Sequence, residues 1–212
     1  PPYTQNLPDT YAILDFIEFC YAHIADPIQG DYHQYFQHFH LSFDKENGKA
    51  LFRTKINRML IRNGIAFDLN VSGQIERVIN PVLKQSFEAF RFNSGDKSLD
   101  DLLKLAVSKF LKPDPMLRRE ALEKVWDAWE RAKTIESGKN KKVQAKSLLH
   151  KAASESKFRE LLEKEAMELT SIGNSFMIRH TETSQTEIEN DNQVDYLFQR
   201  MFSLIVLLLE SR

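Results

Sequence analysis

The residue types best suited to chemistry lie near the C-terminal end of the chain, where an arginine and a histidine are adjacent. The segment 174–180 ends in Ile-Arg-His and is followed by a polar loop. Arginine offers fixed hydrogen-bond donors to a phosphate and keeps its charge, and histidine exchanges a proton near neutral pH. Arg179 and His180 are therefore sufficient in principle for metal-free cleavage of RNA. The His would act on the 2′-hydroxyl or the leaving oxygen, and the Arg would stabilise the phosphorane.

Two polar residues flank this pair and could assist it. Asn174 precedes Arg179 on the expected helix, and Gln185 lies in the polar loop. A simpler interpretation needs no ligand, because Arg and His side chains at a helix C-terminus commonly bind its last carbonyl groups. On residue types alone, the simpler interpretation is favoured.

A second group of candidate residues is the histidine trio His33, His38 and His40, with Asp31 and Asp44 nearby. The His-x-His spacing places two imidazoles on one side of a strand, and a third could complete a three-ligand metal site. Aromatic residues interleave with every histidine, however, and no cysteine contributes. A packed aromatic segment is therefore favoured, and we predict a site without a metal or another cofactor.

Two basic segments could contact nucleic acid. Lysines recur over residues 139–146 and could touch RNA phosphates, although a solvated linker is the favoured interpretation in a chain that is neutral overall. The expected helix over residues 51–62 carries Arg53, Lys55, Arg58 and Arg62 just before a two-stranded wing. That order is compatible with a winged helix-turn-helix that reads DNA.

Composition limits the classes of protein to be considered. The 212 residues include 29 Lys+Arg and 30 Asp+Glu, and the net charge of −1 excludes a globally basic nucleic-acid wrapper. Only 7 Gly and 7 Pro argue against a turn-rich β fold. The single cysteine, Cys20, excludes an intrachain disulfide and fits a reducing compartment. The apolar run 201–209 is too short to cross a bilayer, so we expect a cytoplasmic protein without a membrane partner.

The elements that must position these residues are mostly helical. Apolar residues at helical spacing predict helices over residues 13–24, 50–62, 81–90, 99–110, 122–132, 158–176 and 194–209. Residues 44–48 are predicted to form a polar turn, and the alternation over 65–79 predicts a β-hairpin. The last helix is apolar around much of its circumference, so it is either buried on all sides or shared with a partner.

The chain therefore divides into two expected parts. Residues 1–95 form a small α+β module with one β-hairpin, and residues 96–212 form a helical bundle with short connections. The expected bundle core includes Leu103, Trp126, Trp129, Leu162, Leu169, Met201 and Ile205.

The order of elements around Arg179 resembles a known family. A long helix, an Ile-Arg-His turn, a polar loop and a final helix that begins with Tyr196-Leu197-Phe198 are similar to HEPN domains, the helical bundles of bacterial abortive-infection, toxin and RNA-processing systems. More narrowly, the aromatic and His-rich segment 32–44, with Asn57, Asn63-Gly64 and Gly73 after it, resembles the N-terminal region of AbiJ-type abortive-infection proteins.

This resemblance implies a specific chemistry. HEPN ribonucleases pair an Arg with a His several positions later, dimerise so that two motifs face one composite site, and cleave RNA without metal. Arg179 matches the motif Arg, and His180 occupies the adjacent polar position. The later His is missing, because residues 181–186 contain no imidazole. Either His180 has taken over the acid–base role, or the domain binds RNA without cutting it.

The sequence thus predicts a mainly α bacterial defence protein with a HEPN-like bundle that acts on RNA, as a homodimer through its C-terminal helices. The site residues would be Arg179, His180, Asn174 and Gln185. Two alternatives stay open. One is a non-catalytic sensor or interaction module that regulates an effector or a further domain, and the other is a winged-helix-like DNA-binding regulator.

Overall fold

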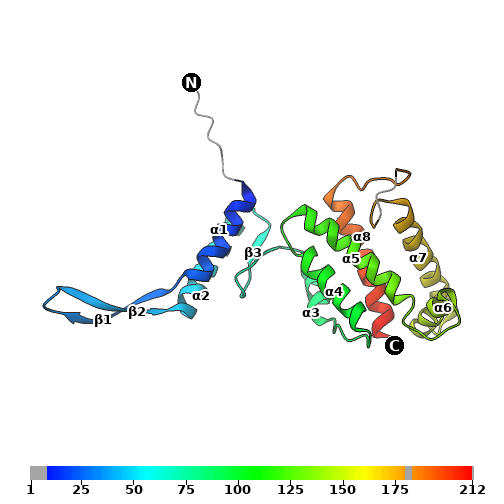
Figure 1. The fold of residues 1–212 in the computed structure, drawn as a ribbon, viewed down its shortest axis with the longest axis horizontal. Helices are drawn as coiled ribbons and strands as arrows, with labels where there is room; N and C mark the ends of the chain where they lie inside the picture. Colours follow the sequence, from blue (N-terminus) through cyan, green and yellow to red (C-terminus); the bar gives the residue numbers. More distant parts are fainter. Residues whose placement is uncertain (1–8, 180–182, 212) are drawn as a thin grey trace, which may run out of the picture. The chain divides into compact units, whose positions relative to one another are not determined.

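The computed structural model describes residues 9–179 and 183–211, and these form two units that divide between Val78 and Ile79 (Figure 1). Eight helices and two short antiparallel hairpins make up the described part of the chain. The prediction of a mainly α protein with a small N-terminal α+β module is confirmed.

The first unit is built around two helices and a hairpin. Helices α1 (Thr10–His23) and α2 (Lys45–Arg62) pack with strands β3 (Phe67–Leu69) and β4 (Ile75–Arg77). The core of this unit is small and consists of Leu14, Tyr21, Leu69 and Ile75. The β3–β4 hairpin is the one that the alternating residues 65–79 predict.

Side chains of both helices hold this hairpin in place. The Asn57 amide bridges the Leu69 backbone, accepting from its N–H at 2.8 Å and donating to its carbonyl at 3.0 Å. The Tyr21 hydroxyl donates to the Val71 carbonyl at 2.8 Å. The hairpin turn needs glycine at position 73, because its φ is +86° and a Cβ there would lie 2.3 Å from the Tyr21 ring.

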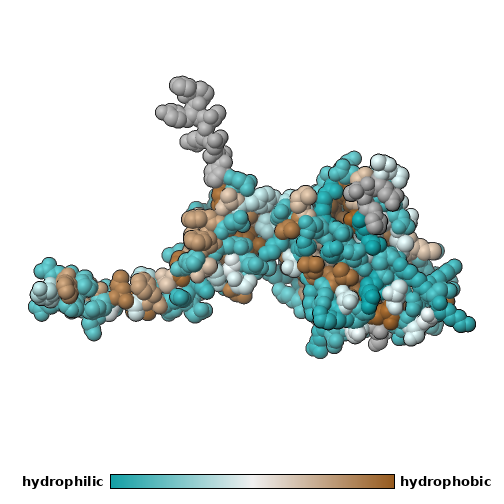
Figure 2. All heavy atoms as spheres, viewed as in Figure 1, coloured by the Kyte–Doolittle hydropathy of each residue, from teal (hydrophilic) through white to brown (hydrophobic). Residues whose placement is uncertain are grey.

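A second hairpin, which the sequence did not predict, forms an extended ribbon in this unit. Strands β1 (Asp26–His33) and β2 (His38–Asp44) pair along their length, and their register shifts between Gln29 and Tyr32. Apolar side chains are exposed along the ribbon, as the brown residues in Figure 2 show. The alternation is clear in β2, but Pro27, Gly30 and the register shift interrupt it in β1, so the pair was not recognisable.

Helix α2 begins earlier than the sequence predicts. The expected polar turn at residues 44–48 is instead the N-cap and first turn of this helix, and the Asp44 carboxylate accepts the Asn47 N–H at 3.0 Å. Gly48, which suggested the turn, lies inside the helix. It is required there because a Cβ would come within 2.5 Å of the Asp26 backbone nitrogen.

The second unit is a bundle organised around one buried helix. Helix α5 (Pro115–Ala132) packs along α4 (Lys97–Phe110) and α8 (Asp191–Glu210). Every predicted core residue is buried, and Trp126 and Trp129 of α5 are each 1% exposed. Helix α3 (Pro81–Ala89) contributes Phe87, whose ring packs edge-on to three phenylalanines of the bundle. The unit therefore starts at Ile79, whereas the sequence placed the division near residue 95.

Two further helices complete the bundle. Helix α6 (Lys141–Ala152) lies in a segment that the sequence presented as a basic linker, and α7 (Ser156–Ser175) precedes the candidate site. Helix α8 is buried by its own chain through eight residues, including Phe198, Met201 and Ile205. The first of the two alternatives for the last helix, burial within the bundle, accounts for its apolar character. Within the described part of the chain, no helix has the length and apolarity that a bilayer crossing requires.

Close approach of α7 to α5 depends on glycine at position 173. A Cβ on Gly173 would lie 2.2 Å from the indole nitrogen of buried Trp126. We predict that Gly173→Ala lowers the free energy of unfolding by about 1–2 kcal/mol, because the overpacking cost exceeds the gain in helix propensity. Both tryptophans lie in α5, so urea unfolding followed by Trp fluorescence reports on the second unit alone. Unchanged or increased stability would contradict the tight contact.

An ion pair joins the start of α4 to α5. The Asp96 carboxylate caps α4 by accepting the Leu99 N–H at 2.9 Å, and it accepts two bonds from Arg131 at 2.7 and 3.1 Å. The Arg131 hydrogen bond, followed by the Leu99 N–H, lowers the pKa of Asp96 below that of an ordinary carboxyl. This stabilisation is therefore present above the unfolded-state pKa and is lost as the pH falls through the folded-state pKa.

We predict that Asp96→Ala lowers the free energy of unfolding by about 1–2 kcal/mol at neutral pH. Asp96→Asn keeps the cap and loses only the half-exposed ion pair, so it costs less than about 1 kcal/mol. The difference between wild type and Asp96→Asn should shrink as the pH is lowered below about 4. A difference that is independent of pH would show that the charge of Asp96 does not matter.

Candidate functional site

The candidate site begins where α7 ends and the chain turns back toward α8. The N–H of Met177 donates to the Thr186 carbonyl at 2.9 Å, and the N–H of Thr186 donates to the Ser175 carbonyl at 2.9 Å. These bonds close the loop between Ser175 and Thr186 at its base. Ile178, 9% exposed, is buried beside the bundle core, so its neighbour Arg179 is held at the surface.

Arg179 forms an ion pair with α5. Its Nε donates to Asp127 Oδ1 at 2.9 Å, and the two side chains are 32% and 24% exposed. Asp127 also accepts from the Lys124 ammonium group at 3.1 Å. The Arg179 guanidinium is accessible to solvent. Within the described residues, its Nε forms a hydrogen bond and its two terminal NH₂ groups form none. Its other N–H groups can bind a phosphate while Nε keeps its carboxylate.

The structure brings the predicted helper residues together through the backbone. The Gln185 side-chain amide donates to the main-chain carbonyl of Asn174 at 3.1 Å. Gln185 therefore helps to close the loop, while the Asn174 side chain is exposed on the last turn of α7. His180 lies outside the described residues, so its prediction as the acid–base group stays a prediction.

A further group of charged side chains, which the sequence did not single out, extends from the same face of α5 to the start of α6. Glu130, one turn along α5 from Asp127, accepts from Lys133 at 2.5 Å and also from Lys141 of α6. Burial lowers the pKa of Lys133, Glu130 opposes this effect, and the positive charges of Lys141 and Arg179 lower it further. Arg179 and the lysines near the start of α6 therefore share one electrostatic environment.

The three histidines lie together on the β1–β2 ribbon. The ring centroids of His33, His38 and His40 are 5.3–5.7 Å apart, and the Phe36 ring packs on His33 at 4.9 Å. Among the residues that the structure describes, no group of three His, Cys, Asp or Glu side chains is arranged to hold a metal ion. The trio therefore forms one exposed aromatic cluster with its neighbours.

Helix α2 presents the basic face on which the DNA-binding alternative depends. Lys55, Arg58 and Arg62 are exposed and lie three and four residues apart, which places them on one side of the helix. Arg53 is half-buried, and Phe52 and Ile56 pack against the core of the first unit, whereas Met59, on the apolar face expected from the sequence, is 53% exposed. Within the described chain, none of the three exposed residues forms an ion pair with a carboxylate.

The Arg179–Asp127 pair is half-exposed, so its contribution to stability should be small. We predict that Arg179→Ala and Asp127→Asn each change the free energy of unfolding of the second unit by less than about 1 kcal/mol, with a coupling of about 0.2–1 kcal/mol. A double-mutant cycle in urea, followed by Trp fluorescence, measures both quantities. A loss of several kcal/mol on Arg179→Ala would mark the arginine as a structural residue and argue against a role with ligands.

Comparison with known proteins identifies the first part of the chain. Residues 2–93 match the family model of AbiJ N-terminal domain 4. No curated protein and no solved structure matches the chain. The predicted resemblance to AbiJ proteins is confirmed, while the HEPN resemblance of the second unit stays a prediction. The match extends past β4 through α3 and so includes residues that pack in the second unit. Residues 2–93 are therefore similar to AbiJ N-terminal domain 4, a likeness that relates this part of the chain to abortive-infection proteins.

Proposed function

We propose that this protein is a phage-defence protein that acts on RNA through its second unit, with Arg179 as the phosphate ligand. The observation that carries the proposal is the AbiJ N-terminal domain over residues 2–93. It is supported by an arginine that is partly exposed at the end of α7 and that is held at the surface by a closed loop.

The proposed chemistry uses Arg179 and His180 together. The guanidinium binds a non-bridging phosphate oxygen and stabilises the negative charge of the phosphorane. His180 takes the proton from the 2′-hydroxyl or gives one to the leaving 5′-oxygen, and the products are a 2′,3′-cyclic phosphate and a 5′-hydroxyl. The guanidinium N–H groups that Asp127 does not use can make this contact with the phosphate while Nε keeps its hydrogen bond to Asp127.

One imidazole cannot act as acid and base at the same time, so a second copy of the chain would complete the site. We propose a homodimer through the C-terminal helices. Most of the apolar side chains of α8 are buried within the bundle, so the contact would rely on exposed residues such as Leu161 of α7 and Tyr196 of α8. Large apolar side chains that are exposed on a surface can take part in such a contact.

A binding role without cleavage is the second candidate for the same site. It is favoured by the absence of the later histidine in residues 181–186 and by the carboxylate that already pairs with Arg179. In this case the protein would sense RNA and regulate an effector.

A third candidate is DNA binding by the first unit, and the basic face of α2 supports it. Lys55, Arg58 and Arg62 are exposed together, and a two-stranded wing follows the helix. Exposed cations on one helix face are the usual phosphate contacts of such domains. The RNA hypothesis ranks above it because the family match indicates a defence protein.

RNA cleavage in EDTA by the purified protein tests the proposal. We expect the wild type to cleave single-stranded RNA and leave 2′,3′-cyclic phosphate ends, and Arg179→Ala and His180→Ala each to lose at least about a hundredfold in rate. Arg91→Ala, which removes an exposed arginine elsewhere in the second unit, is the matched control and should cleave normally.

The other outcomes separate the candidates. RNA binding without cleavage, weakened by Arg179→Ala, would replace the ribonuclease with a sensor. Binding of duplex DNA in preference to RNA, lost on combining Lys55→Ala, Arg58→Ala and Arg62→Ala, would replace both with the DNA-binding regulator.

A further inference from the structure

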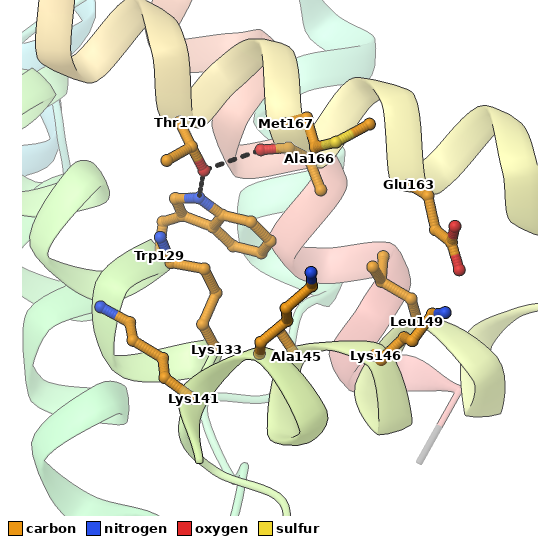
Figure 3. Close-up of a pocket in the computed structure, with 11 residues that line it drawn as sticks. Trp129, Lys133, Lys141, Ala145, Lys146, Leu149, Glu163, Ala166, Met167 and Thr170 are labelled. Atoms are coloured by element: carbon orange, nitrogen blue, oxygen red, sulfur yellow. Dashed lines mark hydrogen bonds between the residues drawn. The ribbon is translucent and has the colours of Figure 1, made fainter.

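A cavity of about 520 Å³ lies between α5, α6 and α7 of the second unit (Figure 3). Its volume is within the range of sites for small organic ligands, about 300–1,000 Å³. Its walls are predominantly apolar and include Ala145, Ala166 and Met167. Trp129 also lines it but is only 1% exposed, and the Lys133 ammonium group lies over its ring, 5.3 Å from the centroid. None of the site residues predicted from the sequence lines this cavity.

The polar atoms at the base of the cavity are already satisfied by the protein. The Trp129 indole N–H donates to the Thr170 hydroxyl at 3.2 Å, and this hydroxyl donates to the Ala166 carbonyl at 2.8 Å (Figure 3). An apolar ligand body can therefore lie on this wall without leaving a buried hydrogen-bonding group unpaired.

The rim of the cavity carries an excess of positive charge. Four lysines and one glutamate line it. Lys133 and Lys141 share the carboxylate of Glu130. Lys142 and Lys146 are exposed, and neither forms an ion pair with any residue in the described part of the chain.

The positions of these lysines are unfavourable for the free protein. Lys142 and Lys146 are four residues apart on α6, where like charges repel each other. Lys141 and Lys142 also occupy the first turn of α6, at the positive end of the helix dipole. An anion bound at the rim would offset both the repulsion between the lysines and their unfavourable interaction with the helix dipole. Anion binding therefore explains why lysines occupy these positions, whereas the stability of α6 does not.

We propose that the cavity binds a nucleoside phosphate, with its phosphate at Lys142 and Lys146 and its base against the apolar wall. Sites for small organic ligands combine mainly apolar walls with a few charged groups that fix the orientation of the ligand. The half-buried Glu163 carboxylate also lines the cavity and can accept a hydrogen bond from a base amino group or a ribose hydroxyl, which a purely hydrocarbon body could not donate. The nucleotide can be free or part of an RNA strand, since the contacts are the same. The inference goes beyond the proposed function, because it does not require Arg179 to cleave anything.

Calorimetric titration of the purified protein with AMP, GMP, CMP and UMP tests the proposal. We expect at least one of the four to bind, and expect adenosine and inorganic phosphate, used as separate probes, to bind at least tenfold more weakly because each lacks half of the contacts. Combining Lys142→Ala with Lys146→Ala should weaken binding at least tenfold. The matched control combines Lys84→Ala with Lys104→Ala, which removes two exposed lysines of the same unit away from the cavity.

A second variant separates the cavity from general electrostatics. Ala145→Phe fills the cavity without changing the net charge, and it should abolish binding while the Trp fluorescence melting curve shows a folded second unit. If no monophosphate binds at millimolar concentration, or if the Lys142/Lys146 variant binds like wild type, the proposal is wrong.

Competition distinguishes the two sources of the nucleotide. If a monophosphate displaces a bound short single-stranded RNA, the RNA occupies the same cavity. If the RNA is not displaced, the free nucleotide is the ligand of the cavity. Both results support the site. If the protein binds a nucleotide but cleaves no RNA, the ribonuclease proposal is wrong and the nucleotide site stands.

Discussion

Helix α5 is the element on which the second unit and both candidate sites depend. Its two tryptophans are almost completely buried, and α7 lies so close to Trp126 that a Cβ at position 173 would be 2.2 Å from the indole nitrogen. The Trp129 indole hydrogen-bonds to Thr170, which fixes the register of α7 against α5. Since the Arg179 loop leaves the C-terminal end of α7, the packing of two indoles determines where the candidate phosphate ligand lies.

The polar side of the same helix organises the charges. Asp127 pairs with Arg179, Glu130 pairs with Lys133 and Lys141, and Arg131 pairs with the capping residue of α4. Each carboxylate holds a cation near the surface and lowers its cost of desolvation. These pairs are neutral or nearly so, and the excess of positive charge lies on α6, where Lys142 and Lys146 are exposed in a chain whose net charge is −1. A phosphate-containing ligand is the partner that such an arrangement can attract.

The sequence predicted the second unit well because burial leaves a strong pattern. Leu103, Trp126 and Ile205 recur at helical spacing, and the structure buries all of them. The sequence was less informative where the role of a residue depends on a segment that is distant in the chain. Gly48 suggested a turn, yet it allows the start of β1 to approach α2. Lys141 and Lys142 suggested a linker, since cations in the first turn of a helix are unfavourable without a ligand or a carboxylate nearby.

The candidate site could be predicted only in part, for a related reason. Arg179, Asn174 and Gln185 could be selected from the sequence by their residue types. The structure joins Asn174 and Gln185 by a hydrogen bond. The partners of Arg179 were not visible, because Asp127 is 52 residues away in the sequence. The cavity between α5, α6 and α7 likewise depends on tertiary packing, which no local pattern encodes.

The central claim is that the second unit contacts RNA at the end of α7 and the start of α6. The most direct measurement is photochemical crosslinking of the purified protein to RNA that contains 4-thiouridine, with the modified peptides mapped by mass spectrometry. We expect the adducts to fall within residues 139–146 and 174–186. Adducts confined to residues 45–62 of α2, or no adducts on the folded protein, would contradict the account.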